Sequence, residues 1–167
     1  WNSVHPMSPE TMIEDVTGLL DVWVAGWAGC RGYQTSKEGR FPAALRADTT
    51  GEWEYFASDP TDQEFAALAA KTAEAPPRGL TILTNDTARY AALAARNGLN
   101  VTSDSQTMMI VDMETQDAEA PWLSDDDLAF STSRQNGVHY AEVRSGATLA
   151  ASGRVFVVGD TAVFDKI

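Results

Sequence analysis

The last thirty residues, 138–167, constrain the fold more than any other stretch of the chain. Three short apolar runs follow one another there, and glycine turns at Gly146 and Gly159 separate them. This spacing predicts a β-meander of three strands. The third strand contains Val163 and reaches Ile167, so we expect an apolar strand edge that needs a partner.

The residues just before the meander predict one more strand and a boundary. Residues 128–133 read as an edge strand, and Asn136-Gly137 is a strong hairpin turn signal. Residues 114–127 hold six acids, no base and little periodicity, which is typical of a linker. The prediction is an N-terminal α/β region over 1–113, an acidic linker over 114–127 and a second unit over 128–167.

The N-terminal region opens with an amphipathic helix. Ser8-Pro9 has the composition of a helix start, and apolar residues then recur every three or four positions as far as Gly29 or Gly32. Trp23 and Trp27 lie one turn apart on that face, a spacing more typical of core packing than of a ligand cage.

Strands and helices then alternate. We expect a hairpin of strands 41–48 and 52–57, followed by a helix that ends at Pro76-Pro77. A buried strand over 80–84, a helix ending at Gly98 and strands near 100–101 and 107–113 complete the series. The predicted class is α/β (α+β), a mixed sheet with covering helices.

Composition excludes several functions. The chain has 167 residues and a formal charge of −12, with scattered arginines, which argues against a nucleic-acid partner. The lone Cys30 cannot form an internal disulfide and agrees with a cytoplasmic protein; a buried, inert thiol is its expected state. No apolar run is long enough to cross a membrane, and no metal-ligand motif is present.

Residues 150–167, AASGRVFVVGDTAVFDKI, resemble the central strands of GNAT superfamily N-acetyltransferases, which use acetyl-CoA. The preceding YAEVRSG at 140–146 resembles an earlier strand of the same meander, and WVAGW at 23–27 with Arg31-Gly32 resembles a Trp-rich helix of bacterial members. Residues 90–99 resemble the last helix and strand of such a fold. The chain would then be a degenerate tandem arrangement whose second unit is incomplete.

The resemblance implies acetyl transfer from acetyl-CoA to a primary amine. It places Asp165 where the family often holds a carboxylate that accepts the amine proton, and Ile167 where backbone pairs with the pantetheine arm. A solvated or salt-bridged aspartate is the alternative for Asp165. Trp27, Arg31 and Tyr33 are the candidates for contacting the acceptor.

The family's pyrophosphate-binding loop, Arg/Gln-x-x-Gly-x-Gly/Ala at a helix N-terminus, is missing from this sequence. We therefore expect the chain as given to bind acetyl-CoA poorly, and to pair its open strand edge with a further C-terminal segment or in a homodimer. A non-catalytic ligand-binding or protein-interaction module that lacks the cofactor half is the alternative function.

Overall fold

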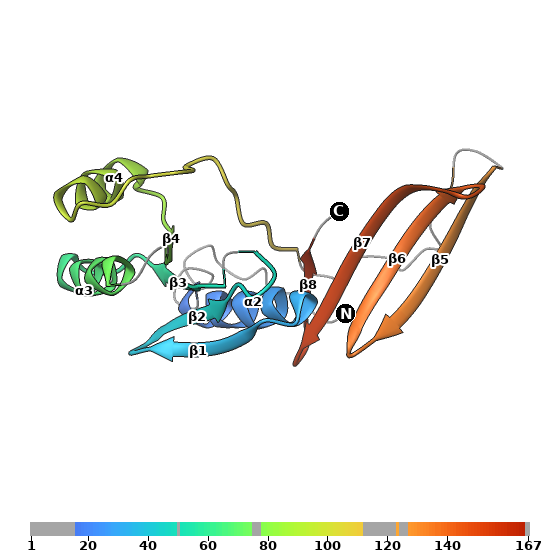
Figure 1. Ribbon diagram of the computed structural model, residues 1–167, viewed down its shortest axis with the longest axis horizontal. Coiled ribbons are helices and arrows are strands. Elements are labelled where there is room, and N and C mark those ends of the chain that lie inside the picture. The colour runs from blue at the N-terminus through green and yellow to red at the C-terminus, as the bar shows by residue number, and fades with distance from the viewer. Residues whose placement is uncertain (1–15, 50, 75–77, 112–122, 124–126, 166–167) are drawn as a thin grey trace, which may run out of the picture.

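The computed structural model describes residues 16–49, 51–74, 78–111, 123 and 127–165. Within them the chain forms three helices and eight strands, and the strands make two four-stranded sheets (Figure 1). The predicted mixture of helices and sheets is confirmed.

The first sheet is mixed, as predicted. Its strands are β1 (Gln34–Glu38), β2 (Phe41–Leu45), β3 (Trp53–Ser58) and β4 (Gly79–Leu83), in that spatial order. The pair β3 and β4 is parallel, and the other neighbours are antiparallel. Strand β1 was not predicted, because its sequence QTSKE has no apolar alternation and lies largely exposed at the sheet edge.

Two helices cover one face of this sheet. Helix α3 (Asp62–Ala73) begins with a capping box between Thr61 and Glu64. Helix α4 (Thr87–Arg96) begins at the cap Asp86 and is followed by Gly98 at φ +72°, the left-handed conformation expected there. The two helices share a small core formed by Phe65, Ala69, Tyr90, Leu93 and Ala94.

The strands predicted near 100–101 and 107–113 are wrong as far as the described residues reach. Residues 99–111 contain no strand, and their side chains are mostly exposed. Met108 packs against a buried core that includes Leu20, Tyr33 and Phe56, whereas the side chain of Met109 is 89% exposed. A strand requires a hydrogen-bonded neighbour, and an apolar run such as Met108 to Val111 does not by itself supply one.

The second sheet is the predicted meander with its additional edge strand. It consists of β5 (Leu128–Gln135), β6 (Val138–Ser145), β7 (Thr148–Val158) and β8 (Thr161–Asp165), each antiparallel to the next. Asn136 and Gly137 have positive φ values of 52° and 82°, which a tight hairpin turn requires. Ile167 and most of the predicted linker lie outside the described residues.

Helix α2 (Val16–Arg31) lies between the two sheets (Figure 1). Its buried aliphatic side chains Leu20, Val24 and Ala28 pack with residues of the first sheet. Toward the second sheet it presents glycines. A Cβ atom at Gly26 would lie 2.3 Å from Val163 Cγ2, and one at Gly29 would lie 2.6 Å from the Phe156 ring. These two glycines therefore set how closely β7 and β8 approach the helix.

We expect Gly26→Ala to destabilise the protein by about 1–3 kcal/mol, because the new methyl group overlaps Val163 in a packed interface. Thr17→Ala, at an exposed position of the same helix, should change the free energy of unfolding by less than about 0.5 kcal/mol. Urea denaturation measures both. A stabilised Gly26→Ala protein would contradict the packing, since alanine exceeds glycine in helix propensity by about 1 kcal/mol.

Candidate functional site

Asp165 is held between two arginines at the junction of α2 with the second sheet. Arg31 donates from Nε to Oδ2 at 3.1 Å and from Nη2 to Oδ1 at 2.7 Å, a bidentate pair. Arg154 donates from Nε to Oδ2 at 2.8 Å. We call these three residues the arginine–aspartate cluster. It carries one net positive charge in a chain whose formal charge is −12.

Local structure explains how the three side chains meet. Arg31 is in the last turn of α2, where a cation interacts favourably with the carbonyl end of the helix. Arg154 and Asp165 are register partners on β7 and β8. Along β8, Val163 and Asp165 are buried whereas Phe164 is 56% exposed, because successive strand residues point to opposite faces.

Burial and charge act in opposite directions on Asp165. Its side chain is only 8% exposed, and burial acts to raise the pKa of its carboxyl. The hydrogen bonds and positive charges of Arg31 and Arg154 outweigh burial and hold that pKa below the usual value of 3.8. Asp165 is therefore ionised at neutral pH and has little tendency to take up a proton.

Aromatic side chains continue the site along α2. The Arg31 guanidinium lies over the Trp27 ring, 5.3 Å from its centroid. Trp27 stacks on Trp23 and meets Tyr33 edge-on at 5.2 Å between centroids. The Tyr33 hydroxyl donates a hydrogen bond to Asp48.

The structure thus brings together four of the five residues predicted for the site. Trp27, Arg31 and Tyr33 form one continuous group, which Asp165 joins through Arg31. The fifth, Ile167, lies outside the described residues. The sequence left open a solvated or a salt-bridged state for Asp165, and the structure shows the salt bridge. Its predicted catalytic role stays a prediction.

Arg154 was missed by sequence reasoning. Its position in RVFVV shows only an arginine at the start of an apolar run. The cross-strand register with Asp165 could have indicated the pair, but that register depends on where the turn at Gly159 falls. Arginine and aspartate directly opposite each other on two strands are a favourable cross-strand pair.

Cys30 adjoins the cluster without joining it. Its thiol donates to the Val163 carbonyl oxygen with an Sγ to O distance of 3.7 Å. Burial raises the pKa of this thiol, and the charge of Asp165 raises it further, so the reactive thiolate is disfavoured. The expectation of a buried cysteine is confirmed.

Other classes of site are not found within the described residues. No group of three or more His, Cys, Asp or Glu side chains there is arranged to hold a metal ion. No helix in the same part of the chain has the length and apolarity needed to cross a membrane.

Comparison with protein-family models, curated proteins and solved structures gives no match for this chain. The resemblance to acetyltransferases therefore depends on the residues quoted above. What the arrangement itself offers is a fixed positive cluster beside an aromatic surface, anchored by an ionised carboxylate.

Asp165→Asn should lower the free energy of unfolding at pH 7 by about 2–3 kcal/mol, because it leaves two neighbouring guanidinium groups without their shared carboxylate. The cost is below that of a fully buried pair, since the Arg31 and Arg154 side chains are 18% and 22% exposed. Urea denaturation of both proteins gives the difference.

The difference should depend on pH in a defined direction. The folded-state pKa of Asp165 is below 3.8, so on acidification the unfolded chain takes up this proton first. The stabilisation is complete above about pH 5 and is lost as the pH falls through the folded-state pKa. Glu142→Gln is the control, because Glu142 pairs with Arg144 at the surface. A gap between wild type and Asp165→Asn that is equal at pH 7 and pH 3 would contradict the ion pairing.

Proposed function

We propose that this chain is a GNAT-like acetyltransferase, or the N-terminal part of one, that transfers acetyl from acetyl-CoA to a primary amine. The observation that carries the proposal is the contact of Asp165 with Arg31, which joins the predicted catalytic residue to the stretch from Trp27 to Tyr33 that was predicted to contact the acceptor. The antiparallel order of β5 to β8 is consistent with it. A cytoplasmic location fits the free, buried Cys30.

Acetyl-CoA fits the described residues only in part. Strand β8 pairs with β7 on one side, and no other described strand pairs with it, so a pantetheine arm can align along the other side as an added strand does. The sequence contains no glycine-rich loop for the pyrophosphate, and its net charge of −12 opposes a polyanion. Acetyl-CoA supplies an activated acetyl thioester; its phosphates require donors other than such a loop.

The arginine–aspartate cluster would favour the reactive form of the acceptor. Only a neutral amine has the lone pair needed to attack a carbonyl carbon. A net positive charge beside the amine disfavours its ammonium form and lowers its pKa. The half-buried Trp27 ring offers aromatic surface for the carbon skeleton of the acceptor, and the buried Tyr33 supports that ring edge-on.

Asp165 has a positioning role in this proposal. A general base works best with a pKa near the operating pH, whereas the pKa of Asp165 is held below 3.8. The carboxylate instead fixes both guanidinium groups through its two oxygens. The amine proton would leave through solvent or through a group other than Asp165.

We expect the natural protein to release free CoA thiol from acetyl-CoA in the presence of a primary amine. Arg31→Gln should shift the acid limb of the kcat profile to higher pH by about one unit, because kcat reports the bound amine, whose ammonium form is then no longer disfavoured. Arg144→Gln, at an exposed surface pair, is the matched control.

An inactive full-length protein across a broad panel of primary amines would overturn the acetyltransferase proposal. An active enzyme whose Arg31→Gln profile matches wild type would retain acetyl transfer and remove the role given to the cluster. General-base action by Asp165 would appear as an acid limb that disappears in Asp165→Asn.

A non-catalytic interaction module is the second candidate, favoured by an exposed apolar face on the second sheet. Phe164 and Val155 are register partners there, and Phe164 and Val157 are 56% and 50% exposed. Apolar side chains gathered on one exposed face are typical of interaction surfaces.

This second candidate predicts self-association through that face, giving a homodimer. We expect light scattering to show a concentration-dependent dimer that Phe164→Glu reduces, because a charged side chain opposes burial of the face. Ala162→Glu should act in the same direction, since Ala162 is exposed on the same side of β8. A monomer at millimolar concentration would exclude the homodimer.

A further inference from the structure

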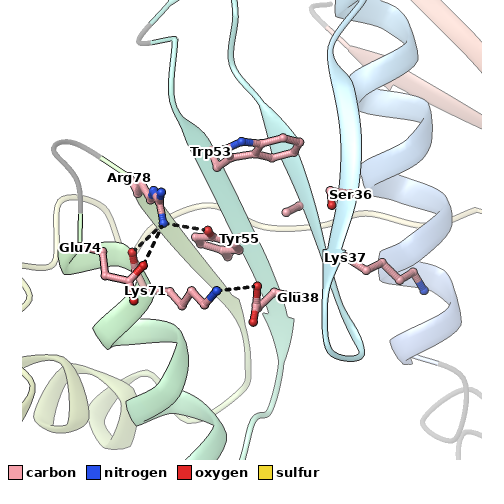
Figure 2. A pocket seen from close by; sticks show the side chains of 9 residues that line it. Ser36, Lys37, Glu38, Trp53, Tyr55, Lys71, Glu74 and Arg78 are labelled. Carbon is pink, nitrogen blue, oxygen red and sulfur yellow. Dashed lines mark hydrogen bonds and ion pairs between the residues drawn. The ribbon is translucent and has the colours of Figure 1, made fainter.

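A cavity of about 300 Å³ lies on the first sheet, on the face opposite α2. Ser36, Ala43 and Tyr55 are register neighbours across β1, β2 and β3 and lie side by side beneath it. Ala43 and Tyr55 are 1% and 6% exposed, so they form the packed floor of the cavity. Trp53 and Glu38 continue the wall (Figure 2).

The C-terminal end of α3 and the residue before β4 supply the cations of the cavity. Lys71 is 3.2 Å from Glu38, and Arg78 is 3.7 Å from Glu74. Figure 2 shows Lys71 and Arg78 on the same side of the cavity, whereas Lys37 points toward α2. Lys37 also lines the cavity, but its ammonium group pairs with Asp21 and is directed away from it.

Hydrogen bonds hold the Arg78 guanidinium in place, but they do not use all of its N–H donors. Its Nη1 donates to the Lys71 carbonyl oxygen at 3.1 Å and to the Tyr55 hydroxyl at 3.3 Å. Its Nε is shielded from solvent and has no hydrogen-bond partner within the described residues. An arginine offers five N–H donors, and a carboxylate can bind two of them at once.

The cavity has more donors than acceptors. Besides Lys71 and Arg78, the Trp53 indole N–H and the Ser36 hydroxyl line it, and neither makes a hydrogen bond with a described residue. The acceptors Glu38 and Glu74 are 40% and 60% exposed, so their ion pairs are weak and open to competition. A donor-rich lining with two cations favours an oxygen-rich anion.

We propose that this cavity binds a small polar organic carboxylate. The carboxylate lies between Arg78 and Lys71 and displaces the long contact of Glu74, while the carbon skeleton lies against the half-buried Trp53. This site is separate from the arginine–aspartate cluster, because Ala43 and Tyr55 face the side opposite Ala44 and Phe56, which pack with α2. It does not depend on acetyl transfer.

The test is a titration of the folded chain with glycolate and succinate, followed by the NMR signal of the Trp53 indole N–H. The loss of one indole signal in Trp53→Phe identifies that signal among those of the five tryptophans. Glycolamide and succinamide, which match the probes in size but carry no charge, are the control ligands. We expect saturable binding at or below about 1 mM for at least one carboxylate.

Arg78→Gln should weaken carboxylate binding by about tenfold or more, because it removes a charged donor pair. Arg89→Gln, at an exposed ion pair with Asp62 on α3, should leave binding unchanged. Lys71→Gln provides a second variant should Arg78→Gln disturb folding. No saturable shift up to about 10 mM, equal binding of the amides, or unchanged binding in both cavity variants would overturn the proposal.

Discussion

The close approach of α2 to β7 and β8 is the constraint on which the rest of the structure depends. Gly26 and Gly29 leave no side chain between the helix and Val163 or Phe156. That contact brings the end of α2 to β8, and Arg31 then reaches Asp165. A bulkier helix surface would separate the two sheets and break the arginine–aspartate cluster, so the packing and the candidate site have a common origin.

Much of the fold could be predicted from the sequence, because its signals are local. Hairpin turns, helix caps and the spacing of apolar residues indicated α3, α4 and the second sheet. Strand β1 could not be predicted, because a polar edge strand is stabilised by pairing with its neighbour and has no apolar pattern of its own. The strand predicted over 107–113 depends on the apolar run from Met108 to Val111, and hydrophobicity indicates a preference for burial without specifying a partner strand.

The candidate site could be predicted less completely. The resemblance implies roles for Arg31 and Asp165 separately, and it does not predict the contact between them. Arg154 follows only from strand register, and the low pKa of Asp165 follows only from having two arginines beside it. Residues from three strands and from the end of a helix line the cavity near Arg78, so no single stretch of sequence predicts it.

The separation of Arg31 and Asp165 by 134 positions has a kinetic consequence. Contacts between distant residues close a long loop, so they are slow to form compared with the hairpins of the second sheet. Docking of that sheet on α2 is therefore expected to be slower than formation of the sheet itself. An interaction changes the folding rate to the extent that it is formed in the transition state, and it changes the unfolding rate by the remainder. The effect of the arginine–aspartate cluster would be divided between the two rates in this way.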